Sequence, residues 1–240
     1  MIIDALVPIL AGTLAAATPL IFAGLGELVA EKSGVINLGV EGMMLIGAVA
    51  AFAAALSGGA PVGLFVGALA GALAALPFAF LTLSLGANQA ASGLATTIFG
   101  IGLSAFIGKF YVSQSLPGMK ALAIPGLAQI PVLGPVLFNQ PPVVYLAFAL
   151  YGALAWMLAR TRWGLVLRAV GESPEAAHAI GYPVLAIRYA AVCFGGAMAG
   201  LGGAYLSTIY TPLWVENMVA GRGWIAVALV VFAAWKPTRL

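Results

Sequence analysis

Long uncharged runs separated by short polar stretches dominate the pattern of this chain. Apolar runs of about 20 residues, the length that crosses roughly 30 Å of hydrocarbon, fall at 2–30, 39–57, 61–84, 90–108, 142–159 and 187–210. A seventh run, 224–235, is too short to span comfortably. In lipid, a helix satisfies its backbone polar groups within the segment. We therefore expect an all-α, polytopic transmembrane bundle of six or seven segments, forming a single domain over residues 1–240.

The composition supports lipid as the main solvent. Of the 240 residues, 63% are apolar, against roughly 45–50% in soluble domains, and 7% are charged, against about 25%. A water-soluble fold cannot be covered with so few charges. The N-terminus carries Asp4 and no basic stretch, so no cleavable signal peptide is expected.

The two longest polar connections differ in charge. Segment 111–141 is rich in proline and poor in charge, whereas 160–187 carries several arginines and glutamates. Because cytoplasmic loops are enriched in Lys and Arg, we expect 160–187 inside and 111–141 outside. Counting helices from there places the N-terminus outside. The basic residues expected inside are Lys32, Arg160, Arg162, Arg168, Arg188, Lys236 and Arg239, and those expected elsewhere are Lys109, Lys120 and Arg222.

Residues for a metal or redox centre are scarce. Cys193 is the single cysteine and His178 the single histidine, so no disulfide framework, metal site or cofactor is expected. Basic residues lie at the ends of apolar runs, as topology signals do, and no nucleic-acid partner is expected. Gly108-Lys109 is followed by Phe110 and misses the spacing of a phosphate loop. ATP-driven transport would therefore need a separate ATPase polypeptide.

A first polar break interrupts two apolar runs at 31–43. Glu27 precedes it, and Glu31, Lys32, Asn37 and Glu41 lie within it among glycines. One interpretation is a short cytoplasmic turn with solvated charges. The other, which we favour because Glu41 opens an apolar run, is a discontinuous helix whose unwound backbone lines a polar cavity.

Two further polar breaks each allow two interpretations. At 86–92, Asn88, Gln89 and Ser92 are either hydrogen-bonding groups suited to a polar solute or the caps of a tight turn. At 214–224, two tryptophans and Arg222 are either interfacial anchors or the approach to a re-entrant half-helix.

Repeated small residues predict close helix packing. Glycines recur four apart at Gly63, Gly67 and Gly71, and again at Gly196 and Gly200, which is typical of helix interfaces in lipid. The tetrapeptide AGLG occurs at 23–26 and 199–202, upstream of the first and third polar breaks. Since the two copies are expected to run in opposite directions, they indicate an inverted repeat.

A short helix is predicted inside the basic connection. Ser173 suits an N-cap, Pro174 the first helical position, Glu175 the helix dipole, and Gly181 the stop. A helix of about seven residues is marginal alone in water, so the membrane domain or a partner must hold it.

Four stretches together resemble a known family. They are EKSGVINLGVEGMMLIGA, SLGANQAASGLATTIFG, RAVGESPEAAHAIGY and AGRGWIAVALVVF. In order and spacing they are similar to permease subunits of bacterial ABC importers of the branched-chain amino acid, ribose and nucleoside group. The likeness is nearest to the shorter nucleoside permease of the simple-sugar type.

The resemblance implies a multi-pass protein of the cytoplasmic membrane that is not itself an enzyme. Its implied partners are ABC ATPase subunits, a second homologous permease, an extracytoplasmic substrate-binding lipoprotein and membrane lipid. Members of the family continue beyond the equivalent of Trp235-Lys236-Pro237 with about two more helices. This chain stops at Leu240, so we expect it to represent a shortened subunit.

The resemblance also suggests roles for residues. The expected solute pathway includes Asn37, Glu41, Asn88, Gln89, Ser92 and Arg222. The helix expected to couple to the ATPase involves Gly171, Glu172, Ser173, Pro174, Glu175, Ala176, Ala177 and Gly181. The favoured function is passage of a nucleoside or simple sugar through an ABC importer. The alternative is an ion-coupled secondary transporter, which would also use broken helices but for which only Glu41 offers an obvious buried carboxylate.

Overall fold

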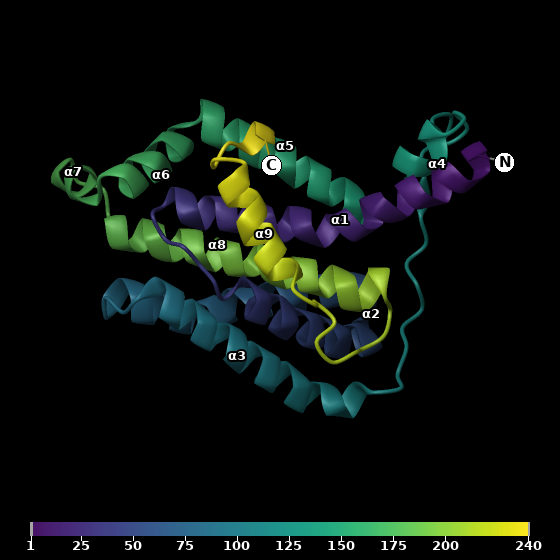
Figure 1. Ribbon diagram of the computed structural model, residues 1–240, viewed down its shortest axis with the longest axis horizontal. Coiled ribbons are helices and arrows are strands. Elements are labelled where there is room, and N and C mark those ends of the chain that lie inside the picture. Colours follow the sequence, from purple (N-terminus) through teal and green to yellow (C-terminus); the bar gives the residue numbers. More distant parts are fainter. Residues whose placement is uncertain (1, 240) are drawn as a thin grey trace.

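Long helices lie side by side in the computed structural model, which describes residues 2–239 and the side chains from residue 6 onward (Figure 1). The expected domain bounds, 1 and 240, lie just outside the described residues. Five of the described helices are long and apolar enough to cross a membrane. They are α1 (Ile2–Lys32), α2 (Val40–Ala79), α3 (Gln89–Gly108), α5 (Pro142–Arg160) and α8 (Val184–Tyr205). The all-α membrane bundle is confirmed.

Helix α2 contains two of the expected spans. Gly59 has φ 75° and ψ 174°, a non-helical conformation that favours glycine and reverses the chain. The two halves then run antiparallel in contact: a Cβ on Gly63 would lie 2.7 Å from the carbonyl oxygen of Ala51, and one on Gly67 would lie 3.0 Å from that of Gly47. The gap expected between 57 and 61 is therefore a tight turn within α2.

The two predicted glycine stripes pack against each other. A Cβ on Gly71 would lie 2.7 Å from the Cα of Gly200, so the backbones of α2 and α8 touch directly. Helix α8 also packs on α1, where a Cβ on Gly26 would lie 2.7 Å from the carbonyl oxygen of Gly195 and one on Gly202 would lie 2.9 Å from that of Pro19. These pairs show that α1 and α8 are antiparallel and that both AGLG copies serve this interface.

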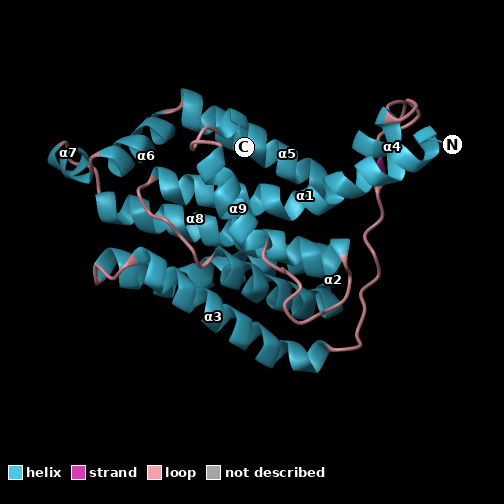
Figure 2. Ribbon diagram, viewed as in Figure 1, coloured by secondary structure: helices cyan, strands magenta, loops and turns pink. Residues whose placement is uncertain are grey.

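Short elements connect the long helices, and nearly all are helical (Figure 2). After α2 and α8 come single π-helical turns, η1 (Phe80–Ser84) and η3 (Leu206–Tyr210). The 111–141 connection contains α4 (Leu133–Leu137) and a two-residue antiparallel pair of β1 (Leu122–Ala123) and β2 (Asn139–Gln140). The others are the 3₁₀ turns η2 (Lys109–Tyr111) and η4 (Pro237–Arg239), and the helices α6 (Arg162–Glu172), α7 (Pro174–Ala179) and α9 (Arg222–Phe232).

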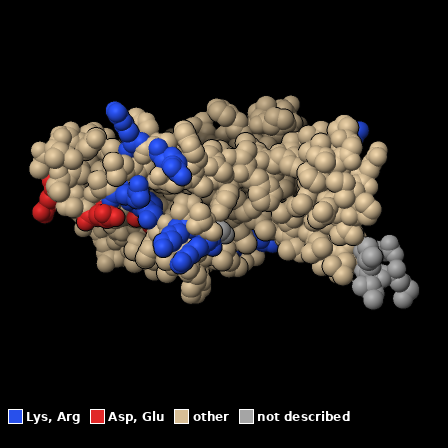
Figure 3. All heavy atoms as spheres, turned by 90° about the horizontal axis from the view of Figure 1, so that it is seen from above, with Lys and Arg blue, Asp and Glu red and all other residues tan. Residues whose placement is uncertain are grey.

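Basic residues gather at one end of the bundle, where α1 and α5 end and α8 begins. Figure 3 shows most of the visible Lys and Arg over this end, with acidic residues beside them. We call it the basic end and define it by Lys32, Arg160, Arg162, Arg168 and Arg188. The N-terminus and α4 lie at the opposite end (Figure 1).

Candidate functional site

Two segments without helix return from the ends of the bundle toward its middle. Segment 33–39 leaves the basic end after α1 and leads into α2, and segment 211–221 leaves the opposite end after η3 and leads into α9. Both lie on the face turned toward the viewer in Figure 1. We call them the first and second re-entrant segments. Broken helices of this kind form the solute sites of many transporters.

Side chains of α1 and α3 hold the backbone of the first re-entrant segment. The Gln89 side chain, from the start of α3, accepts a hydrogen bond from the N–H of Ile36 at 2.9 Å. The Glu27 carboxylate, from α1, accepts one from the N–H of Asn37 at 2.8 Å. Because an unpaired buried backbone group is costly, these bonds allow the chain to leave helical geometry inside the bundle.

Asn37 turns the chain toward α2. Its side-chain oxygen accepts a hydrogen bond from the N–H of Gly39 at 2.9 Å, and its amide nitrogen lies 3.4 Å from the sulfur of Met43. The side chain is fully buried. Asn37 therefore stabilises the turn. Because its side chain is buried, it shapes the backbone of the expected solute pathway and does not present an exposed hydrogen-bonding group to a solute.

Glu41 joins the beginnings of two helices. It occupies the second position of α2, is 4% exposed, and its two carboxylate oxygens accept hydrogen bonds from the N–H groups of Gly221 and Gly223, both at 2.7 Å. Gly221 precedes α9 in the left-handed conformation, with φ 85°. A carboxylate at a helix N-terminus binds free N–H groups and complements the helix dipole. Glu41 thus caps α9 from the start of α2.

Helix α9 is a half-helix. Its 11 residues extend about 16 Å, half of the hydrocarbon thickness. It starts beside Glu41 and crosses α1 obliquely (Figure 1). Beyond its end, the indole N–H of Trp235 donates a hydrogen bond to Glu31 near the end of α1. Of the two interpretations of 214–224, the re-entrant half-helix is the one that the structure supports.

The remaining expected pathway residues lie beside these segments. Asn88 caps α3 by accepting a hydrogen bond from the N–H of Ala91 at 3.0 Å, and its side chain is exposed. Ser92, one turn later, is buried. Arg222 donates to the carbonyl oxygens of Met218 and Val219, within the second re-entrant segment. The capping interpretation of the second polar break holds for Asn88.

The predicted helix in the basic connection is α7. Ser173 caps it by accepting a hydrogen bond from the N–H of Ala176 at 3.4 Å, with Pro174 first in the helix. Ala177, one of the residues expected to couple to the ATPase, is 2% exposed because it packs against Val166, Val170, Val184 and Ile187 of α6 and α8. Ile180, directly after α7, is an exposed apolar residue, at 73%.

Sequence reasoning also missed other residues of the site. Helix α6, which includes Gly171 and Glu172, was read only as connection, although Thr161 caps it by accepting a hydrogen bond from the N–H of Gly164. Thr97 donates to the carbonyl oxygen of Leu38 at 3.0 Å, and nothing in an apolar run marks such a threonine. Arg188 was read only as a topology signal.

Comparison with known proteins decides the family. The family model described as the permease component of the branched-chain amino acid transport system matches residues 9–239. The chain belongs to this permease family. It is 45% identical over 237 residues to a putative glucose ABC transporter permease of Haloferax volcanii, covering 97% of this chain and 72% of that protein. It is 38% identical to a guanosine ABC transporter permease of Bacillus subtilis, covering 98% and 78%, and 32% identical to a nucleoside ABC transporter permease of Lactococcus lactis, with the same coverage.

Family membership establishes the general role of the protein. This permease is an integral protein of the plasma membrane and a transport component. Because these relatives are permeases of ABC transporters, the comparison favours an ATP-driven importer over an ion-coupled secondary transporter. In a transport protein built of helices, the two non-helical re-entrant segments are therefore the parts whose function has to be explained.

Proposed function

We propose that this permease forms half of the membrane path of an ATP-driven importer for neutral, hydroxyl-rich solutes, namely nucleosides or simple sugars. Glucose, guanosine and nucleosides are named for the three relatives. These solutes share several hydroxyl groups and lack a net charge. A path for them needs polar groups that replace water, and it needs no countercharge.

The exposure of both re-entrant segments on one face carries the proposal. In the first, Ile36 is 50% exposed, and in the second, Val215 is 48% exposed with Glu216 and Asn217 also exposed. Non-helical backbone at membrane depth is tolerated only where protein covers it or where it lines a water-filled cavity. This face therefore belongs to the solute path and to the contact with a second, homologous permease, and not to lipid.

The expected pathway residues divide into two roles in this proposal. Asn37, Glu41 and Gln89 fix the backbone of the break, since their polar atoms are used by hydrogen bonds within the chain. The side chain of Asn88 is exposed, and it adjoins Gln89, which holds the first re-entrant segment. Hydrogen bonds to a solute add only about 0.5–1.5 kcal/mol each, so the path binds weakly and releases its cargo.

The two ends of the bundle meet different partners. We place the basic end in the cytoplasm by its Lys and Arg, so that α7 docks on an ABC ATPase through its exposed face. The opposite end, with the 111–141 connection, receives solute from an extracytoplasmic binding lipoprotein. Affinity then resides in the lipoprotein and energy in the ATPase.

Purification from native membrane followed by reconstitution tests the proposed function. The permease should bring with it an ATPase subunit and a second permease. Proteoliposomes of that complex, supplied with the binding lipoprotein, should take up labelled guanosine or glucose only when ATP is present on the ATPase side. Uptake driven by a proton or sodium gradient without ATP would instead revive the ion-coupled transporter.

A further inference from the structure

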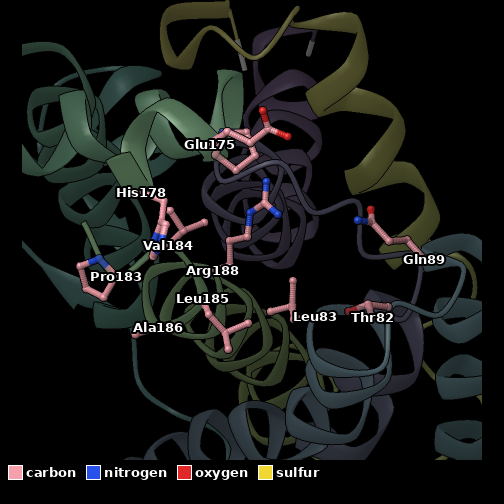
Figure 4. Close-up of a pocket in the computed structure, with 11 residues that line it drawn as sticks. Thr82, Leu83, Gln89, Glu175, His178, Pro183, Val184, Leu185, Ala186 and Arg188 are labelled. Atoms are coloured by element: carbon pink, nitrogen blue, oxygen red, sulfur yellow. The ribbon is translucent and has the colours of Figure 1, made fainter. Parts of the chain in front are cut away.

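A cavity of about 680 Å³ opens at the basic end between two walls. One wall is formed by α7 and the start of α8, with Glu175, His178 and Arg188. The other is formed by η1, which follows α2, and by the start of α3, with Thr82 and Gln89. Figure 4 shows Arg188 and Gln89 coming from these different walls.

Each wall holds one point of the first re-entrant segment. Arg188 donates from Nε to the carbonyl oxygen of Ser33 at 3.0 Å, where the segment begins. Gln89 accepts from the N–H of Ile36 at 2.9 Å, three residues later. The segment therefore bridges the two walls, and any change in their separation must be absorbed by residues 33–36.

Within the cavity wall that contains Arg188, the start of α8 packs closely against α7. Ala177 of α7 packs against Val184 and Ile187, in the first turns of α8, and Arg188 follows directly. The guanidinium also donates to the carbonyl oxygen of Val170, at the end of α6, at 3.4 Å. One side chain thus connects the helix pair that carries α7 to the start of the segment.

The residues around Ser33 and Gly34 are closely packed. Gly34 has φ 86°, and a Cβ on it would lie 3.0 Å from Nη2 of Arg188. Helices α6 and α1 also touch, because a Cβ on Gly171 would collide with the carbonyl oxygen of Lys32. Because the packing is close, a displacement of α7 and α8 moves Ser33 and Gly34 as well and is not absorbed by loosely packed side chains.

We propose that Arg188 and Gln89 are positioning residues for energy coupling: they convert movement of α7 relative to α3 into movement of the first re-entrant segment. The inference rests on the proposed function, because the force on α7 comes from the ATPase. It adds that the segment changes conformation in each cycle, and that Glu27 and Thr97 hold its inner end while residues 33–36 move. Neither Arg188 nor Gln89 need touch the solute.

Matched variants of the reconstituted importer test the inference. Gln89→Leu removes the acceptor for Ile36, whereas Gln89→Glu keeps one. Arg188→Met removes the donors for Ser33, whereas Arg168→Met is a control, because Arg168 donates only to Gly164 of its own helix. We expect Gln89→Leu and Arg188→Met to lower uptake by about tenfold, in the range known for residues that carry coupling, while co-purified ATPase and basal ATP hydrolysis stay unchanged.

Hydrogen exchange separates coupling from structural support. In the wild-type importer, the amides of 33–36 should change their exchange rate when ATP binds. In Gln89→Leu and Arg188→Met this change should disappear, and in Gln89→Glu and Arg168→Met it should remain. Wild-type uptake in the first pair, or an undiminished ATP response of 33–36, would overturn the inference.

A reversible cross-link covers variants that fail to assemble. With Cys193→Ser as background and Gln89 intact, a disulfide-containing linker between Ile36→Cys and the exposed Ala90→Cys should stop uptake, and reduction should restore it. Full cross-linking with unchanged uptake would also overturn the inference. A wild-type complex without an ATPase would overturn the proposed function itself and the inference with it, and this outcome is visible before any variant is made.

Discussion

The carboxylate of Glu41 accepts a hydrogen bond from the backbone N–H of Gly223 at 2.7 Å, although 182 residues separate them. Both residues occupy the second position of their helices, α2 and α9. A Cβ on Gly223 would lie 2.6 Å from the Cα of Glu41, so one helix supplies the carboxylate and the other the space for it. The two breaks, each downstream of an AGLG copy, thus meet at one capped junction.

Removing the carboxylate of Glu41 should loosen α9. Glu41→Leu leaves two N–H groups without their charged acceptor, and hydrogen bonds to charged groups contribute about 1.5–3 kcal/mol each. We expect a loss of about 3 kcal/mol or more in stability, together with loss of uptake. Glu41→Gln, which keeps one acceptor, should lose about half as much. Thermal unfolding in detergent measures the first effect, and equal stability of the Leu variant and the wild type would refute the capping role.

Adding one methyl group at Gly223 should disturb the same junction. In Gly223→Ala the new Cβ collides with Glu41 backbone, and overpacking of this kind costs about 1–3 kcal/mol. Gly102→Ala is the matched control, because a Cβ there meets no atom within 4 Å. Melting curves of the two variants should differ by several degrees. If both unfold at the wild-type temperature, the junction is looser than the structure shows.

The spans were predictable because each depends on local composition alone. The expected run 142–159 is helix α5 (Pro142–Arg160), and 90–108 is α3 (Gln89–Gly108). Capping chemistry also located α7 from Ser173, Pro174 and Gly181. These signals lie within one helix, where hydrophobic length and terminal hydrogen bonds decide the conformation.

The candidate site was only half predictable, for a physical reason. The sequence indicated that Glu41 is unusual, but its partners come from a segment whose position depends on the whole bundle. The packing of Ala177 against α6 and α8 was not predictable, because the six residues of α7 are too few to show which side is apolar. Arg188 was interpreted as a topology signal because it is a basic residue at the edge of an apolar run, and nothing in the sequence indicated its contact with Ser33.

Cysteine labelling should establish the orientation. In a Cys193→Ser background, Ala179→Cys at the end of α7 and Gln129→Cys in the 111–141 connection provide two exposed positions. An impermeant maleimide added to intact cells should label Gln129→Cys at once and Ala179→Cys only after the membrane is opened. Labelling of both from outside would contradict the proposed topology.

The last prediction separates the two faces of α7. Ile180→Arg should leave the bundle folded, because that side chain is exposed, but it should abolish ATPase docking by placing a charge where an apolar contact forms. Ala177→Arg should instead disrupt the packing of α7 on α6 and α8, since a buried unpaired charge costs several kcal/mol or displaces the helix. Co-purification of the ATPase should therefore be lost in both variants, whereas only Ala177→Arg should lower the thermal stability of the permease alone. If Ile180→Arg retains the ATPase at wild-type stoichiometry and supports uptake, docking must use a surface that does not include Ile180.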